Sequence, residues 1–225
     1  MEVASMLEGI DGSFTAKDKR AITKDWELAL KHLKKFKNMH MINTVGPLVV
    51  GVYLDMARFN KYYIPKYFVH NLCREFPAFT STLRVKGKMI TVEKHEEMYM
   101  REAEFITEQA FIPISGDLKI DKIIAGYERY FTAPNPTAIT EYEDLALLCG
   151  WFKDHKRIEY VLNIVYNELK SWPEERYFVR EYGSFEAWFK NLEERVWKGD
   201  ELDSIFASEL MRHKLTKIPE RKILF

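Results

Sequence analysis

The spacing of apolar residues changes twice along this chain, and these two changes limit the folds that it can adopt. Between residues 15 and 36 apolar side chains recur every three or four positions, which is typical of an amphipathic helix. From about residue 46 to 92 they alternate with polar ones, the period of a strand with one buried face. From residue 93 onwards the helical period returns. The pattern predicts an α+β fold with an N-terminal helix, a small antiparallel meander sheet and a helical C-terminal half.

The first predicted helix begins at Thr15, which forms a capping box with Asp18, and continues through TAKDKRAITKDWELALKHLKKF (15–36). A basic amphipathic helix of this kind can contact nucleic acid or an acidic protein, or it can simply be solvated. We favour the solvated interpretation, because lysine stems commonly cover apolar surface. The lysines of its polar side are Lys17, Lys19, Lys24, Lys31, Lys34, Lys35 and Lys37.

Four strands should follow, joined as a meander. Residues 57–61 supply the first turn, and Lys86-Gly87 supply a tight turn between the last two strands. We expect the second strand to begin at Pro65 and to end before Pro77. The four segments are PLVVGVYLDM (47–56), KYYIPKYFVHNLCREFP (61–77), FTSTLRV (79–85) and KMITV (88–92).

Six helices are expected in the C-terminal half, each with an apolar stripe. Thr140 with Glu143 forms a second capping box, and Ser184 and Asp200 are predicted to cap the last two helices. The segment TAPNPTA (132–138) interrupts the helical pattern, and no long linker follows it. We therefore expect a single domain over residues 1–225, with a sub-lobe boundary near 132–138.

Charge and cysteine content indicate the compartment. The 34 basic residues balance the 34 acidic ones, so no net field attracts nucleic acid or an anionic membrane. Cys73 and Cys149 belong to no CxxC or Cys/His cluster, which is typical of reduced, buried thiols. The start MEVASMLEGIDG lacks the regions of a secretory signal, and the run VGPLVVGVYL (45–54) is too short to span a bilayer. We expect a soluble cytoplasmic protein that uses no cofactor and no membrane.

Two short patterns resemble catalytic or metal sites but are incomplete. His95-Glu96-Glu97 matches the start of a zincin helix, yet Tyr99 stands where the second histidine belongs. Asp117-Leu118-Lys119 fits half of a nuclease pattern, but Asp117 is better placed to cap a helix. A solvated acidic face and a helix cap are the favoured interpretations.

The polar residues of the second strand offer no nucleophilic pair. Cys73 follows His70 by three positions, so the two side chains point to opposite faces of a strand. Two alternatives remain for His70. If Phe68, His70 and Leu72 face the core, His70 is a buried imidazole bonded to a neighbour and Asn71 lies outside. If the other face is buried, His70 is exposed in an aromatic surface.

Tyrosine is abundant in and around the first two strands, and protein interfaces favour tyrosine. We predict that this strand–turn–strand region forms part of a surface for a macromolecular partner. The competing interpretation places the same face under the C-terminal helices as core, and solvent exposure decides between the two. The predicted binding residues are Tyr53, Asp55, Arg58, Tyr62, Tyr63 and Tyr67.

The segment GVYLDMARFNKYYIPKYFVHNL (51–72) resembles a strand–turn–strand stretch of bacterial immunity proteins from polymorphic or contact-dependent toxin systems. The resemblance covers about a tenth of the chain and carries over no functional residue. It implies a small cytoplasmic fold without chemistry of its own, which binds and occludes one toxin domain.

These observations predict a non-enzymatic protein that binds a protein partner, with toxin neutralisation as one form of that binding. Two alternatives belong to other classes. One is a metal-dependent nuclease or hydrolase with a dispersed active site, which metal-stimulated turnover would reveal. The other is a nucleic-acid-associated regulator that uses the lysine-rich first helix, which salt-sensitive retention on DNA would reveal.

Overall fold

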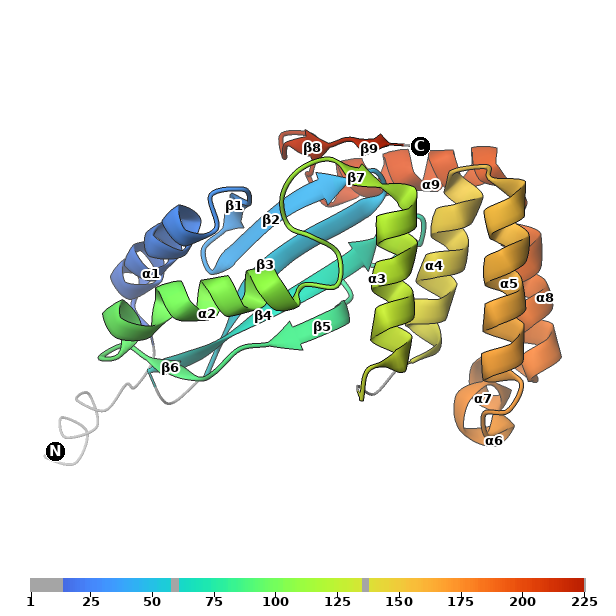
Figure 1. Cartoon of the computed structure of the whole chain (residues 1–225), viewed down its shortest axis with the longest axis horizontal. Helices are drawn as coiled ribbons and strands as arrows, with labels where there is room; N and C mark the ends of the chain where they lie inside the picture. The colour runs from blue at the N-terminus through green and yellow to red at the C-terminus, as the bar shows by residue number, and fades with distance from the viewer. Residues whose placement is uncertain (1–13, 58–60, 135–137, 225) are drawn as a thin grey trace, which may run out of the picture.

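The computed structural model describes residues 14–57, 61–134 and 138–224. It has the predicted α+β fold, with an N-terminal helix, an antiparallel sheet and a helical C-terminal half. Helices α1 (Ala16–Ala29) and α2 (His95–Gln109) lie on one side of the sheet, and further helices stack beside one end of it (Figure 1). Among the residues that the structure describes, no helix is both long and apolar enough to cross a membrane.

Helix α1 begins as predicted but ends early. Thr15 Oγ1 accepts from the Asp18 N–H (3.1 Å) and Asp18 Oδ2 accepts from the Thr15 N–H (2.9 Å), so the capping box is confirmed. The helix ends at Ala29, and β1 (Lys34–Lys37) is a strand. The prediction of a helix through residue 36 was wrong, because β1 pairs with β2 (His40–Val45) and this pairing outweighs the helical preference of lysine.

The main sheet follows chain order, β1-β2-β3-β4-β5. At its centre β3 (Leu48–Met56) pairs antiparallel with β4 (Tyr62–Asn71), and β4 pairs on its other side with β5 (Thr82–Lys86). The short strand β8 (Glu220–Arg221) joins β2 in parallel. The meander is therefore present, and β1 and β2 extend it before the predicted range of 46–92.

The last turn of the predicted meander is different. Strand β6 (Ile90–Thr91) pairs with the start of β4, whereas the sequence suggested a hairpin between β5 and β6 at Lys86-Gly87. β4 begins at Tyr62, before Pro65, and Pro65 lies where the partner of β4 changes from β6 to β5. Proline has no N–H to donate, so it is tolerated at this gap between the two partner strands. Its carbonyl is still used, because it accepts from the Gly87 N–H (2.9 Å).

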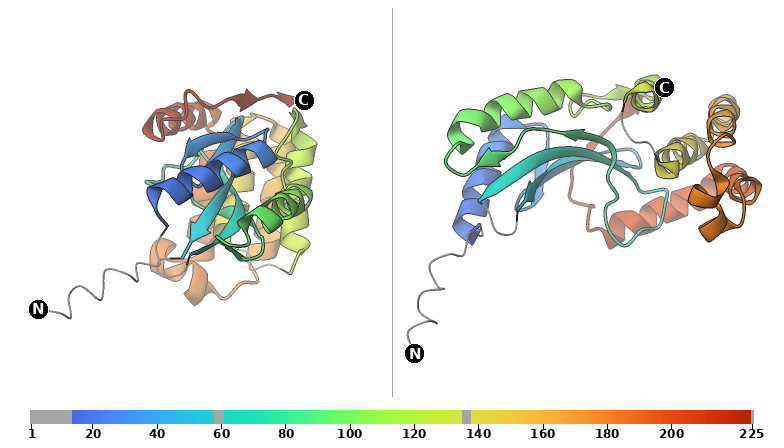
Figure 2. Two further views of the ribbon diagram at one scale, coloured as in Figure 1. Left: turned by 90° about the vertical axis from the view of Figure 1, so that its left-hand side faces the viewer. Right: turned by 90° about the horizontal axis from the view of Figure 1, so that it is seen from below.

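The two faces of the sheet are covered differently. Side chains that alternate along β3 and β4 pack against α1 and α2 on one face, which we call the helix-covered face. The opposite face contacts the end of α9 and the segment that follows it, through Phe206, Leu210, Leu215 and Ile218. In the right-hand view of Figure 2, α9 lies on that opposite side only near the helical half. The helix-covered face consists of Met41, Val45, Leu48, Val50, Val52, Leu54, Tyr63, Tyr67 and Val69.

The helical half starts after the loop that follows α2. Among the described residues it also holds two short strands that pair in parallel, β7 (Leu118–Lys119) and β9 (Ile223–Leu224). Helix α4 is the central one and contacts α3, α5, α8 and α9. The helices are α3 (Ile120–Thr132), α4 (Ile139–Trp151), α5 (His155–Leu169), α6 (Glu174–Tyr177), α7 (Val179–Tyr182), α8 (Phe185–Val196) and α9 (Gly199–Arg212).

The predicted caps of these helices had mixed outcomes. Ser184 Oγ accepts from the Ala187 N–H (3.1 Å) and caps α8 as predicted. The predicted box of Thr140 with Glu143 is not formed: α4 begins two residues earlier, where Glu141 accepts from the Ala138 N–H (2.8 Å) and the alanine side chain offers no acceptor in return. Asp200 lies within the first turn of α9 and does not cap it. Asp117 accepts from the Lys222 N–H (3.1 Å), which links the start of β7 to the C-terminal strands.

One cluster of buried apolar residues runs from the helix-covered face into the helical half. It contains Cys73 and Cys149, which are free and buried as predicted. Burial raises the pKa of the Cys73 thiol and raises that of Cys149 to about 12, so neither forms a thiolate readily near pH 7. The predicted boundary at 132–138 falls partly outside the described residues, which resume at Ala138.

Replacing both cysteines with alanine should leave partner binding intact and lower the free energy of unfolding by about 1–2 kcal/mol per site. The native protein should also react slowly with iodoacetamide, since both thiols are buried. Loss of binding in a folded double variant would identify a functional thiol. Unfolding in urea and mass spectrometry of the alkylated protein measure the two effects.

Candidate functional site

A chain of buried hydrogen bonds joins α1, β4 and α2 through Tyr63. Trp26 Nε1 donates to the Tyr63 hydroxyl (3.0 Å), this hydroxyl lies 2.7 Å from His95 Nδ1, and His95 Nε2 lies 3.1 Å from Asp25 Oδ2. The Trp26 indole can only donate, so the Tyr63 oxygen accepts from it. In the tautomer in which Tyr63 donates to His95 Nδ1, the ring proton of His95 lies on Nε2, next to Asp25.

The hydrogen bonds of His95 limit its ability to bind a metal ion. Asp25, His95 and Glu96 bring possible ligand atoms within 4.8 Å of one another. A metal ion would need the lone pair of His95 Nε2, because Nδ1 is already hydrogen-bonded to Tyr63. His95 Nε2 lies 3.1 Å from Asp25 Oδ2, which already gives it a partner, and the ring of Tyr99 stacks on His95 with centroids 4.8 Å apart. The contacts favour a structural link between three elements over a metal centre.

Tyr63 and Tyr67 were predicted to lie on a binding surface, and this prediction is corrected. Both side chains are 0% exposed, on the helix-covered face of the sheet. The Tyr67 hydroxyl donates to the Ile112 carbonyl (2.9 Å) and accepts from the Ile112 N–H (3.2 Å). The physical reason is the period of the strand: neighbouring residues such as Tyr62 and Tyr63 point to opposite faces and cannot share a surface.

Three other predicted residues lie on the opposite face. Tyr53 and Tyr62 are half-buried there, and Asp55 is exposed. Tyr53 pairs across the strands with Lys66, whose Nζ contacts Asp55 Oδ2 at 2.5 Å. Arg58 lies outside the described residues.

His70 is a buried structural histidine, so the first of the two alternatives is confirmed for His70 but not for Asn71. Its Nδ1 accepts from the Thr80 N–H (3.1 Å), and its ring packs on Phe79 and His213. Burial lowers the His70 pKa to about 3, with further contributions from His213 and Arg74, so the imidazole is neutral near pH 7. Asn71 was expected outside the sheet and is instead fully buried.

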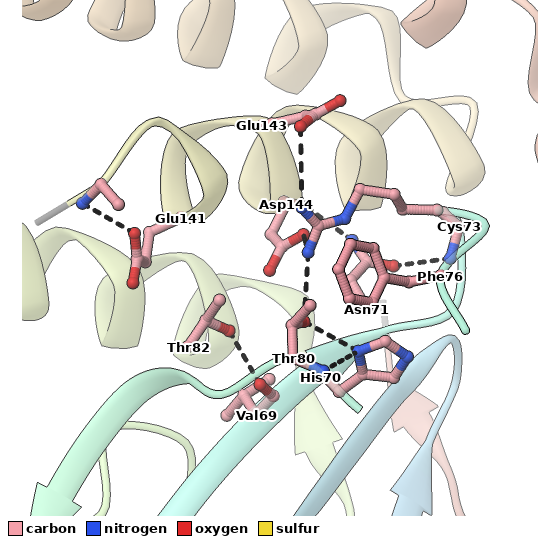
Figure 3. Close-up of polar contacts among 12 residues, drawn as sticks. Val69, His70, Asn71, Cys73, Phe76, Thr80, Thr82, Glu141, Glu143 and Asp144 are labelled. Atoms are coloured by element: carbon pink, nitrogen blue, oxygen red, sulfur yellow. Dashed lines mark hydrogen bonds and ion pairs between the residues drawn. The ribbon is translucent and has the colours of Figure 1, made fainter. Parts of the chain in front are cut away.

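Asn71 belongs to a polar cluster where the end of β4 meets α4 (Figure 3). Its Nδ2 donates to the Asp144 carbonyl (2.7 Å), and its Oδ1 accepts from the Cys73 N–H (2.8 Å). Arg74 Nη2 lies 3.4 Å from Asp144 Oδ1, and Arg74 Nη1 lies 3.8 Å from Glu143 Oε2. Arg195 contacts the other oxygen of Glu143 at 2.5 Å. The cluster thus ties the sheet to α4 and α8.

Asp144 is the least favourably placed carboxyl in this cluster. Its side chain is 0% exposed, and neither carboxylate oxygen has a hydrogen-bond partner among the described residues. Burial raises its pKa from 3.8 to about 7, which Arg74 opposes and the nearby carboxylates of Glu143 and Glu141 reinforce. A carboxyl with such a pKa could serve as a general acid or base.

The adjoining cleft does not reach this carboxyl. The cleft has a volume of about 610 Å³ and is lined by Arg74, Glu143, Arg195 and Tyr182 among others, whereas Asp144 is not part of its wall. Arg74 and Arg195 both pair with Glu143, so the charges that face the cleft are largely balanced. The arrangement therefore favours a structural junction over an acid–base site.

An aromatic groove of about 380 Å³ lies on the face that carries Tyr53. Its walls are ring pairs: Phe36 with Phe79 (centroids 5.5 Å apart) and Tyr53 with Phe68 (5.7 Å). Beside the groove, Gly51 pairs with Phe68 across the strands, and a Cβ there would lie 2.6 Å from the Met41 carbonyl oxygen and 3.0 Å from the Phe68 ring. The missing side chain lets the Phe68 ring lie over β3.

From the groove the same face continues along β3 and β4 without a described helix over it. His40 stacks on Tyr53 with centroids 5.8 Å apart, and Lys66 Nζ lies 5.8 Å from the centre of the Tyr53 ring. The cross-strand pair Asp55 and Ile64 comes next, followed by Tyr62 on the same side. We call this surface the open face and define it by Phe36, His40, Tyr53, Asp55, Tyr62, Ile64 and Lys66.

The sequence could have identified most of the open face. Tyr53, Asp55 and Tyr62 were found by composition, and strict alternation also points to Ile64 and Lys66. Phe36 and His40 were missed because the first two strands were missed. No family model, curated protein or solved structure matches this chain.

Proposed function

We propose that this protein is a non-enzymatic partner-binding protein and that the open face is where its protein partner docks. The observation that carries this proposal is the aromatic groove next to Tyr53, on a sheet face that α9 covers only at one end. Large rings that are half-buried beside a groove suit a protein interface, since they offer contact area at low entropic cost.

Toxin neutralisation is the specific form of binding that we propose, and it rests on the resemblance of segment 51–72 to immunity proteins. Such a protein would act by occluding a toxin domain, and the half-buried rings of Tyr53 and Tyr62 supply a surface for that contact. We also propose a cytoplasmic location, which the two free thiols support.

The test uses a photo-reactive phenylalanine analogue at position 62 to identify the partner in cells of the native host. Tyr53→Ala and Tyr62→Ala should then weaken binding to the purified partner by about 1 kcal/mol or more each, because both remove interface area. Both variants should stay folded, since neither ring is fully buried. Tyr160→Ala is the matched control, on α5, where the Tyr160 ring is 53% exposed.

Isothermal titration calorimetry measures the affinities of wild type and the three variants. Equal affinities for wild type and both open-face variants would refute docking at this face. If the partner is a toxin domain, its activity should be lost on mixing with wild-type protein at equal concentration, and about fivefold more Tyr53→Ala protein should be needed for the same inhibition. A toxin that stays active in the wild-type complex would refute neutralisation while leaving partner binding intact.

A further inference from the structure

We infer that the open face recognises an acidic segment of its protein partner, with an apolar or aromatic side chain seated in the groove beside Tyr53. This inference rests on the proposed function and adds the chemistry of the partner. Two observations support it: the lysines around the groove and the aromatic walls of the groove.

Lysines surround the open face, although the whole chain has a net charge of zero. Lys37 lines the groove, and Lys34 lies opposite Ile42, a residue of the same sheet face. Lys86 pairs with Lys66 across β4 and β5, which places it on this face as well. These lysines and Lys66 outnumber Asp55, the acidic residue of the open face, so positive charge predominates on this surface.

These charges are only partly compensated within the described part of the chain. Asp55 neutralises Lys66 through the 2.5 Å contact. Lys37 and Lys86 are exposed and have no ion pair among the residues that the structure describes. Lys66 and Lys86 lie directly opposite one another on neighbouring strands, and because Asp55 pairs with Lys66, the charge that is left for an acidic partner at this position is that of Lys86.

The aromatic groove indicates what an acidic segment would insert. Its walls are apolar rings, and His40 at its side is neutral because burial, and next the charge of Lys37, lower its pKa. A neutral apolar groove bordered by lysines matches a partner with the complementary arrangement, an apolar anchor bordered by carboxylates.

A single-stranded nucleic acid would also bring negative charge to lysines and aromatic rings, but its bases need free ring faces for stacking. Here His40 stacks on Tyr53, and the Phe68 ring lies within 6.1 Å of Phe79 in a stacked arrangement. These ring faces are thus covered by neighbouring rings and are not free to stack on a base. The geometry favours a protein segment.

The probes are three fluorescein-labelled 12-residue peptides of defined composition: glutamate-rich with one tryptophan, glutamate-rich without an aromatic residue, and lysine-rich with one tryptophan. A fluorescein-labelled 12-nucleotide oligo(U) is the fourth probe. Fluorescence anisotropy of the full chain should show the tightest binding for the first peptide. That binding should weaken as salt rises from 50 to 500 mM, because the attraction is electrostatic.

Charge reversal tests the lysines. The double variant Lys37→Glu with Lys86→Glu should weaken binding of the first peptide by about tenfold, mainly through the association rate. The control double variant Lys156→Glu with Lys190→Glu changes exposed lysines on α5 and α8 and should bind as wild type does. Circular dichroism confirms that each variant is folded.

Three results would overturn the inference: equal binding by wild type and Lys37→Glu/Lys86→Glu, equal binding of the lysine-rich peptide, or tighter binding of oligo(U). The outcome can be separated from that of the proposed function. If Tyr53→Ala weakens the natural partner while charge reversal and salt do not, the face binds a partner that is not acidic. If neither Tyr53→Ala nor charge reversal has an effect, the open face is not a docking site.

Discussion

Replacing Asp144 with asparagine should stabilise the protein at pH 8 by about 4 kcal/mol and leave its stability near pH 4 almost unchanged. Burial raises the pKa of this carboxyl from 3.8 to about 7 in the folded protein. Each unit of that difference corresponds to about 1.4 kcal/mol. The protonated carboxyl is tolerated in the fold, and asparagine resembles it in shape and charge.

The sign follows from the protons bound in each state. Between pH 4 and 7 the folded protein holds a proton on Asp144 that the unfolded chain has lost, so this residue makes stability fall as pH rises. His70 acts in the opposite direction, because its pKa falls to about 3 on folding and its contribution is lost below about pH 6.5. The difference between wild type and Asp144→Asn isolates the carboxyl, since His70 is present in both.

Urea unfolding at pH 4, 5, 6, 7 and 8 measures this difference, which should grow by about 1.4 kcal/mol per pH unit up to pH 7. Glu143→Gln is the matched control, because Glu143 pairs with both Arg74 and Arg195 and its loss should destabilise the protein. If Asp144→Asn is less stable than wild type at pH 8, the ion pair with Arg74 outweighs the cost of burial.

The second large effect on stability is expected from removal of the Tyr67 hydroxyl. Tyr67→Phe should lower the free energy of unfolding by about 2–4 kcal/mol, because it leaves the buried N–H and C=O groups of Ile112 without their partner. Tyr62→Phe is the control on the same strand. Its ring is half-buried on the other face, and its loss of a hydroxyl should change stability by less than about 0.5 kcal/mol.

Thermal or urea unfolding of the two variants gives the comparison. Equal stability of Tyr67→Phe and wild type would mean that water replaces the hydroxyl at Ile112, and that Tyr67 is less enclosed than its 0% exposure implies. A large loss in Tyr62→Phe would show that the open face is covered by another part of the protein.

The contrast between Tyr62 and Tyr67 also shows what the sequence could and could not predict. Alternation in β4 was readable, and it already forbids Tyr62 and Tyr63 from sharing a surface. The sequence does not indicate which face of the sheet α1 and α2 cover. Both faces of β3 and β4 carry apolar residues at the end near α4. Tyr63 and Tyr67 were therefore wrong as surface residues, and binding by Tyr53, Asp55 and Tyr62 stays a prediction.

Helix starts were predicted correctly where the capping contact joins residues close together in the sequence. Thr15 and Ser184 cap their helices through contacts three residues away. Strand β1 was missed because KKFK has no strand signal of its own and depends on pairing with β2. Strand β6 was assigned to the wrong neighbour, since its pairing with the start of β4 depends on the path of the whole sheet.

The polar cluster between the end of β4 and α4, which includes Asn71, Arg74 and Asp144, was not predicted. Asn71 was expected at the surface, and no property of residues 71 to 74 indicates that they meet Asp144, which is 73 positions away from Asn71. The buried acids of α4 were read only as part of a helical pattern. Burial of charged residues depends on which elements pack together, and a single sequence does not encode that in any local pattern.

The central claim is that a protein partner docks on the open face and not on the helix-covered side. The most direct measurement places a photo-reactive phenylalanine analogue singly at Tyr53, Tyr62, Met100 and Tyr160, and compares cross-linking to the same partner. Met100 on α2 and Tyr160 on α5 are 47% and 53% exposed and mark other surfaces. The account predicts adducts from positions 53 and 62 and none from 100 or 160. Adducts from position 100 or 160 with none from 53 and 62 would contradict it.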